Sequence, residues 1–144
     1  MMDFNNIDVA ELIPHSDKMV WLDSIISCDN HSLSAELIVR DEGLSGNDKT
    51  VPAWVGIEYM AQAVAAYAGV MAKQAGEPIK LGFLLGTRRY SSNVAEFSVG
   101  STLTVRVEKI LQDNNLGAFE CRIQGVDVEA SAILNVYQPP LRNL

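Results

Sequence analysis

The longest apolar run of the chain extends from residue 51 to residue 72, and its positions are almost all small, apolar or aromatic. Its recurrent alanines favour an α-helix. Pro52 suits the first turn of that helix, where its missing N–H costs nothing, and residues 75–78 (AGEP) end it. The run therefore predicts one long helix over about residues 53–74. A helix that is apolar on all sides is normally buried on all sides.

The segments on both sides of this helix alternate between apolar and polar positions, as half-buried strands do. A short helical turn is predicted over residues 8–13, and strands are predicted over residues 19–27, 32–40, 80–90, 102–111, 118–124 and 128–137. We expect the third of these strands to bend near Gly82 or Gly86. The connections after the helix are short, so the sheet is expected to be antiparallel.

One antiparallel sheet curled around one long helix is therefore the predicted α+β fold, in a single domain over residues 1–144. The sheet can enclose the helix only if something covers its open side. A second subunit is the expected cover.

Composition and charge narrow the class of protein. The chain has 144 residues, of which 48% are hydrophobic and 20% charged, as in globular domains. A formal net charge of −7 argues against a general binder of nucleic acid or of anionic membranes. The central run is about long enough to span a membrane, but it contains Glu58 and Gln62 and lacks flanking basic clusters.

Cysteine and histidine usage points to a reduced, cytoplasmic protein without a metal site. Cys28 and Cys121 form no C-x-x-C pair. The chain has only two histidines, His15 and His31, which offer little material for metal binding. The N-terminus has acidic residues where a signal peptide needs basic ones, so we identify no targeting segment.

Glu58 is the only carboxylate or basic residue between residues 51 and 72. Carboxylates are rarely buried without a partner or a task. Burial raises the pKa of a carboxyl group, which then carries a proton near neutral pH, and such acids concentrate at functional sites. The alternative is a structural carboxylate paired with a remote cation or hydroxyl. Gln62, one helical turn later, is placed to orient Glu58 by a hydrogen bond.

Four stretches carry a family resemblance. Residues 12–15 (LIPH) with 20–23 (VWLD) resemble L-P-H…L-L-V-D, and residues 52–62 (PAWVGIEYMAQ) resemble P-G-x-x-x-x-E-A-M-A-Q. Residues 89–90 (RY) with 99–101 (VGS) resemble A-R-F…P-G-D. Residues 129–130 (EA) resemble C-E-A. These motifs are those of the 3-hydroxyacyl-ACP dehydratases, and together they span nearly the whole chain. The resemblance implies the hotdog fold.

The resemblance breaks at one catalytic position. The family's histidine lies in a G-H-F-P-G segment just before the helix, and residues 43–47 (GLSGN) contain none. The ApeP-like branch, associated with aryl-polyene pathways, is more similar, with its P-H near the N-terminus and Trp at the helix start. This resemblance implies that the histidine is supplied from elsewhere. His15 is the candidate, although it could instead cap the short helix or pack in the core.

The resemblance also implies a reaction. It is the dehydration of a 3-hydroxyacyl thioester to a trans-2-enoyl thioester in fatty-acid or aryl-polyene-type lipid synthesis. The acyl group is carried by the phosphopantetheine of acyl carrier protein, and no further cofactor is expected. His15 would remove the α proton and Glu58 would protonate the departing hydroxyl. N–H groups of Ala53 or Trp54 would hold the thioester oxygen, although Ala53 narrows the approach that the family's glycine allows. Trp54 would line the thioester channel or belong to the core.

Lys80, Arg88 and Arg89 stand out in this acidic chain. Two arginines near a tunnel mouth suit an acidic carrier protein and the phosphate of its phosphopantetheine. The alternative is a solvated strand edge that positive charge protects from aggregation.

The sequence leaves more than one assembly and more than one function open. The protein is expected to be a homodimer, or a heterodimer with another dehydratase. One rival function is a hotdog acyl thioesterase in which Glu58 activates water. The other is a non-catalytic subunit that binds acyl chains or completes a dehydratase heterodimer.

Overall fold

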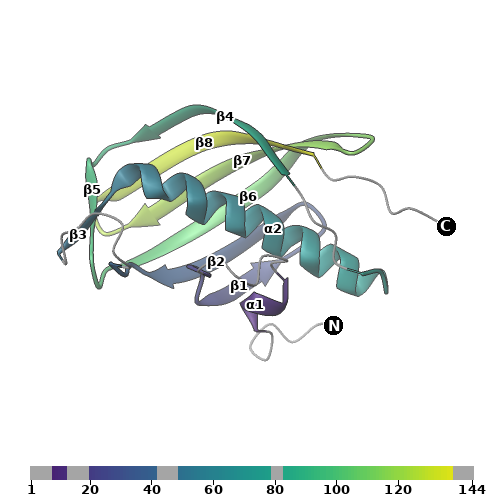
Figure 1. The fold of residues 1–144 in the computed structure, drawn as a ribbon, viewed down its shortest axis with the longest axis horizontal. Coiled ribbons are helices and arrows are strands. Elements are labelled where there is room, and N and C mark those ends of the chain that lie inside the picture. Colours follow the sequence, from purple (N-terminus) through teal and green to yellow (C-terminus); the bar gives the residue numbers. More distant parts are fainter. Residues whose placement is uncertain (1–7, 13–19, 42–48, 79–82, 138–144) are drawn as a thin grey trace.

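The computed structural model describes residues 8–12, 20–41, 49–78 and 83–137, and all structural statements below concern these residues. They form a curved antiparallel sheet with one long helix against its concave face (Figure 1). No helix among them is long and apolar enough to cross a membrane.

The long helix is α2, Gly56–Gln74, and the 3₁₀ turn η2, Ala53–Val55, leads into it. The helix predicted over residues 53–74 is therefore confirmed. At its end Gly76 has a φ of 71°, and the Glu77 N–H donates to the Ala72 carbonyl, which are the features of a glycine-based C-terminal cap.

Six strands form the main sheet in the order β1-β2-β6-β7-β8-β4, and every neighbouring pair is antiparallel, as predicted. The strands are β1 (Ser24–Cys28), β2 (Ser32–Ile38), β4 (Phe83–Ser92), β6 (Thr102–Asp113), β7 (Leu116–Gly125) and β8 (Val128–Tyr137). Two further strands that the sequence pattern did not predict, β3 (Thr50–Pro52) and β5 (Glu96–Ser98), pair with each other at the start of α2.

The strand predicted over residues 19–27 begins later than expected, at Ser24. Trp21 and Leu22 are buried but lie before β1. The backbone N–H of Trp21 donates to the Gln62 side chain of α2, so the helix helps to hold this part of the chain.

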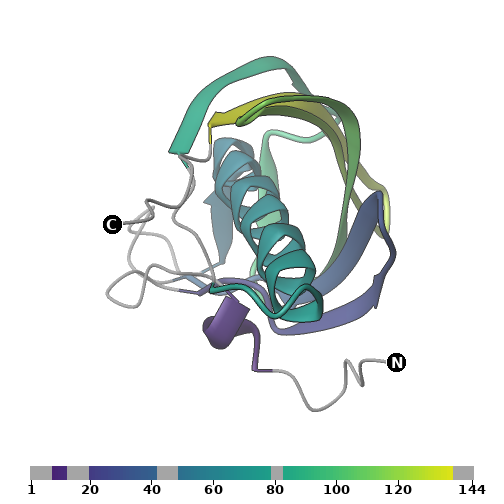
Figure 2. The ribbon, with the colours of Figure 1, turned by 90° about the vertical axis from the view of Figure 1, so that its right-hand side faces the viewer.

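The sheet curves around α2 but does not enclose it (Figure 2). The helix buries Tyr59, Met60 and Tyr67 in the core. On its opposite face Trp54 is 61% exposed and Glu58 is also exposed. The single chain therefore leaves one side of the helix uncovered, because one sheet covers only the helix surface that faces it. The predicted cover by a second subunit stays a prediction.

Strand β4 is an edge strand whose register against β8 shifts twice. The first shift, between Leu84 and Gly86, agrees with the predicted bend near Gly86, and Gly82 lies outside the described residues. The second shift, between Arg88 and Ser91, was not predicted. It holds Arg89 at a φ of 57°, a left-handed conformation that costs a non-glycine residue free energy.

A short helix, α1 (Val9–Leu12), packs against α2 at Gly69. A Cβ atom on Gly69 would lie 2.6 Å from the Leu12 carbonyl oxygen and 3.0 Å from the Leu12 Cβ. Leu12 is fully buried, so it has no free space into which to move. The glycine is therefore what allows the backbones of the two helices to approach so closely.

Gly69→Ala should lower the free energy of unfolding by roughly 1–2 kcal/mol, because overpacking at α1 outweighs the gain of about 1 kcal/mol in helix propensity. Urea unfolding measures the change. Gly86→Ala is the control, since a Cβ there meets nothing within 4 Å. Equal stability of Gly69→Ala and the wild type would show that α1 moves away without cost.

Candidate active site

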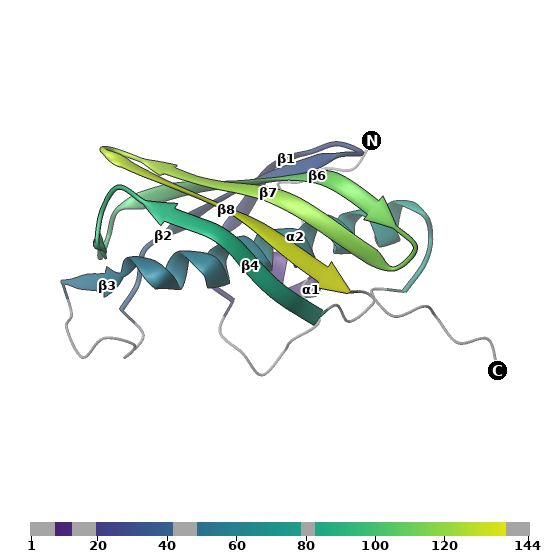
Figure 3. The same ribbon diagram turned by 90° about the horizontal axis from the view of Figure 1, so that it is seen from above.

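The start of α2 is fixed from two directions. The N–H of Ala53 donates to the Ala95 carbonyl at 2.9 Å, and the hydroxyl of Tyr90, on β4, donates to the Ala53 carbonyl. Strand β3 pairs with β5. It leads directly into the helix (Figure 3). Val51 and Phe97 face each other in that pair and are fully buried. The first turn of the helix is therefore anchored to the body of the protein.

This anchoring corrects one predicted role. The Ala53 N–H is already bonded to Ala95, so it is not free to hold a substrate oxygen. The Trp54 N–H has no hydrogen bond within the described part of the chain. It lies at the helix start, where unpaired N–H groups and the helix dipole favour negative charge. Of the two predicted donors, Trp54 is the one that remains.

The Trp54 indole is not a core residue, since 61% of its surface is exposed. Glu58 follows it by four residues and therefore lies on the same face of the helix, one turn further on. Its expected burial is wrong for the single chain. An exposed carboxylate beside an exposed indole and a free N–H is accessible to a ligand that approaches the open face of α2.

Gln62 connects this face to the segment before β1. Its side chain is only 6% exposed, and its Oε1 accepts the Trp21 N–H at 2.8 Å. That contact directs Nε2 toward Glu58, to which it donates at 3.5 Å, a long hydrogen bond. The hydrogen bond predicted between Gln62 and Glu58 is therefore present.

Arg40, which the sequence pattern did not single out, holds the same segment from the other side. Its guanidinium donates to Asp23 Oδ1 at 2.9 Å and to the carbonyls of Val20 and Trp21 at 3.0 Å each. It also lies 5.9 Å from the centre of the Trp21 ring, within cation–π distance. These contacts depend on how β1 pairs with β2, which a hydrophobic pattern does not specify.

Several predicted residues are not placed beside Glu58. His15, Lys80 and residues 43–47 lie outside the described residues. His31 lies in an exposed turn next to Asn30, whose carbonyl accepts the Tyr67 hydroxyl. Tyr67 follows Glu58 by nine residues, which is roughly 14 Å along a helix. His31 is therefore far from the start of α2.

Arg88 and Arg89 are exposed on β4, in the irregular segment that also carries Tyr90. Tyr90 itself is half-buried and reaches the start of α2. The two arginines thus lie on the edge strand that contacts the candidate site. No three His, Cys, Asp or Glu side chains among the described residues gather as they would around a metal ion.

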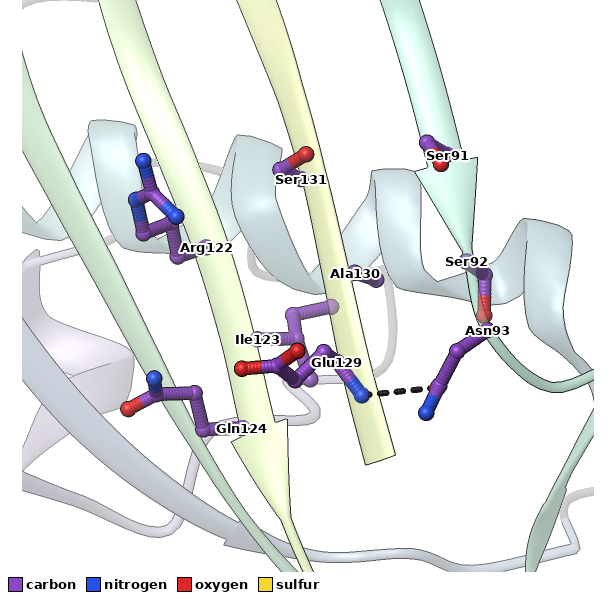
Figure 4. Close-up of a pocket in the computed structure, with 9 residues that line it drawn as sticks. All are labelled: Ser91, Ser92, Asn93, Arg122, Ile123, Gln124, Glu129, Ala130 and Ser131. Atoms are coloured by element: carbon purple, nitrogen blue, oxygen red, sulfur yellow. Dashed lines mark hydrogen bonds between the residues drawn. The ribbon is translucent and has the colours of Figure 1, made fainter. Parts of the chain in front are cut away.

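A pocket of about 240 Å³ lies elsewhere, near the ends of β4, β7 and β8. Figure 4 shows it on the side of the sheet away from α2, with the Glu129 N–H donating to Asn93 Oδ1 at 2.8 Å. Most of its lining side chains are polar, and neither Trp54 nor Glu58 contributes to it. This pocket is therefore separate from the candidate site.

The antiparallel sheet wrapped on one long helix, with a carboxylate in the first helical turn, defines a hotdog-fold protein. The chain matches the family model of the ApeP dehydratases over residues 7–144, and it belongs to this ApeP-like family. A comparison with curated proteins gave no match.

Solved structures agree with this assignment. A chain of the dehydratase heterocomplex ApeI:P from Xenorhabdus doucetiae is 34% identical, with a TM-score of 0.84 covering 93% of this chain and 92% of that chain. The uncharacterised protein PH1136 from Pyrococcus horikoshii is 12% identical, with a TM-score of 0.66 covering 92% and 94%. A hypothetical thioesterase with coenzyme A from Streptococcus pneumoniae TIGR4 is 12% identical, with a TM-score of 0.61 covering 83% and 87%. The last two share the fold alone.

Gln62→Met should lower the free energy of unfolding by roughly 1–3 kcal/mol, because the buried Trp21 N–H loses its acceptor. Urea unfolding measures this change. Gln74→Met, at the exposed end of the same helix, is the matched control and should change stability by less than about 0.5 kcal/mol. Similar free energies of unfolding for the two variants would mean that the hydrogen bond to Trp21 does not stabilise the protein.

Proposed function

We propose that this chain dehydrates 3-hydroxyacyl thioesters carried by acyl carrier protein to trans-2-enoyl thioesters. Membership of the ApeP-like family supports a dehydratase. The observation that carries the proposal is the start of α2, where the Trp54 N–H is free and the exposed Glu58 carboxyl follows about one turn further on. An electrophilic donor and an acid are two of the three groups that the reaction needs.

The proposed reaction removes one water molecule from the substrate. A base takes the proton from the α carbon, and negative charge develops on the thioester oxygen, where the Trp54 N–H stabilises it. The electron pair then forms the double bond as the bond between C3 and its hydroxyl oxygen breaks. Glu58 supplies the proton with which that hydroxyl leaves as water. A substrate lying on the open face of α2 would displace water from Glu58 and so strengthen these interactions.

His15 is proposed as the base. The chain has two histidines, and His31 lies in a turn that contacts α2 at Tyr67, nine residues beyond Glu58. The Gln62 side chain links Glu58 to Trp21, which follows His15 by six residues in the sequence. These hydrogen bonds support a catalytic base from the N-terminal part of the chain.

Glu58→Gln and His15→Ala should each lower kcat by about 100-fold or more, since a positioned acid or base contributes on the order of 10²–10⁴. The measurement is the mass of the acyl-carrier product formed from a 3-hydroxyacyl substrate. Glu129→Gln and His31→Ala, which alter exposed residues away from the site, are the controls and should keep wild-type turnover.

The two site variants can refute the roles separately. Full activity of Glu58→Gln would exclude the acid role, and full activity of His15→Ala would exclude the base role. Release of free acid and thiol would instead indicate a thioesterase.

A second candidate is a non-catalytic subunit of a dehydratase heterodimer. The missing histidine in residues 43–47 and the match to a chain of a dehydratase heterocomplex favour it. In that case turnover would appear only with a partner dehydratase and would survive both site substitutions.

We also propose that the chain works as a pair of subunits, as a heterodimer with another dehydratase or as a homodimer. Besides Trp54 and Glu58, the open face of α2 carries the half-buried Ala61, Ala65 and Ala68. A partner or the acyl chain would cover these small residues. Cys28 and Cys121 are both free, which fits action in the reducing cytoplasm, in fatty-acid or aryl-polyene-type lipid synthesis.

Arg88 and Arg89 are proposed to bind the carrier protein and the phosphopantetheine phosphate. The chain has a net charge of −7, so attraction of an acidic partner requires a local positive surface. Exposed arginines on the strand that contacts the helix start provide one.

The double variant Arg88→Ser, Arg89→Gly should raise KM for the carrier-bound substrate by roughly tenfold with little change in kcat, since two exposed charge pairs are lost. KM for the same acyl group on free pantetheine, which bears no phosphate, should not change. Glycine at position 89 keeps the left-handed conformation without strain, and Arg106→Ser on β6 is the control. Equal KM increases for both substrates would contradict a carrier-binding role.

A further inference from the structure

The hydroxyl of Tyr90 reaches the start of α2 because β4 is irregular. The register shift between Arg88 and Ser91 and the left-handed Arg89 precede the half-buried Tyr90 side chain. The hydroxyl donates to the Ala53 carbonyl. Burial raises the pKa of Tyr90 above its usual value, so the hydroxyl stays protonated and can act as a donor at neutral pH.

The space for this hydroxyl exists because residue 56 is a glycine. A Cβ on Gly56 would lie 2.5 Å from the Tyr90 oxygen and 3.0 Å from the Ile123 Cδ1. The Gly56 N–H also donates to the Ala53 carbonyl. That carbonyl therefore receives two hydrogen bonds, one from the helix backbone and one from the neighbouring strand.

The Ala53 carbonyl and the Trp54 N–H belong to the same peptide group. The peptide is planar and trans, so the two groups point in opposite directions, and fixing one fixes the other. A donor on the carbonyl also draws electron density from the amide and makes its N–H a stronger donor. The Trp54 N–H has no bond to any described residue and remains available to a ligand.

We propose that Tyr90 is a positioning residue whose hydroxyl orients and polarises the peptide that presents the Trp54 N–H to the thioester oxygen. The inference rests on the proposed function, in which that N–H stabilises the developing oxyanion. Stabilisation of this kind is greater in the transition state than in the bound substrate, so it acts on kcat more than on KM.

The test is Tyr90→Phe, which removes only the hydroxyl. Its matched control is Tyr67→Phe, because the Tyr67 hydroxyl, in the C-terminal half of α2, also donates to a backbone carbonyl, that of Asn30 at 2.5 Å. Tyr90→Phe should lower kcat about tenfold, less than the 10²–10³ lost with a direct oxyanion donor, and leave KM within about twofold. Tyr67→Phe should leave both constants unchanged.

A spectroscopic readout separates polarisation from simple stability. The carbonyl stretch of a 1-¹³C-labelled trans-2-butenoyl pantetheine thioester should shift to lower frequency when the ester binds the wild type. The shift should be smaller in Tyr90→Phe and unchanged in Tyr67→Phe. A Tyr90→Phe variant that only melts at lower temperature, with wild-type kcat and carbonyl shift, would overturn the inference.

Gly56→Ala provides an independent approach, because the new Cβ must displace the Tyr90 hydroxyl. It should reproduce the loss in kcat, and the double variant with Tyr90→Phe should lose no more than either single variant. Additive losses would contradict a shared cause.

This inference and the proposed function can fail separately. If the wild type does not interconvert the two acyl thioesters, the proposed function fails, and the carbonyl shift of the bound ester still decides the role of Tyr90. If the wild type is active and Tyr90→Phe matches it in kcat and carbonyl shift, only the role of Tyr90 fails.

Discussion

The anchoring of the first turn of α2 is the constraint on which the candidate site depends. The Ala53 peptide groups are bonded on both sides, the N–H to Ala95 and the carbonyl to Tyr90, so the next N–H has a fixed direction. Glu58 takes its position from the same turn, and the buried Gln62 ties it to Trp21. A helix end held in this way fixes the positions of an N–H donor and a carboxyl group, and the proposed reaction depends on both.

Much of the fold could be predicted because the spacing of apolar residues along the sequence was clear. The helix predicted over residues 53–74 and the strand predicted over residues 128–137 were confirmed with these bounds. The pair β3–β5 was missed because three-residue strands are too short to show a period. The second irregularity of β4 was missed because no glycine marks it, and Arg89 adopts the left-handed conformation there.

The site was predicted less completely. The motif around Glu58 pointed to the first turn of α2, but composition cannot tell which side of a helix a single sheet leaves open. Glu58 was therefore expected to be buried, and Trp54 was left between a channel wall and the core, whereas both are exposed. The remaining contacts join residues far apart in the sequence. They are the hydrogen bond from the Ala53 N–H to the Ala95 carbonyl and the hydrogen bonds of Arg40 and Tyr90. Tertiary contacts of this kind leave no local signal.

The fold alone does not separate a dehydratase from a thioesterase, since both classes occur among the structural neighbours. The most direct test of the central claim is to incubate the protein with a trans-2-enoyl-carrier substrate in ¹⁸O-water and to locate the label by mass spectrometry. Reversible hydration across the double bond should place ¹⁸O in an acyl chain that is still attached to the carrier. Label found only in the carboxylate of released acid would contradict the account.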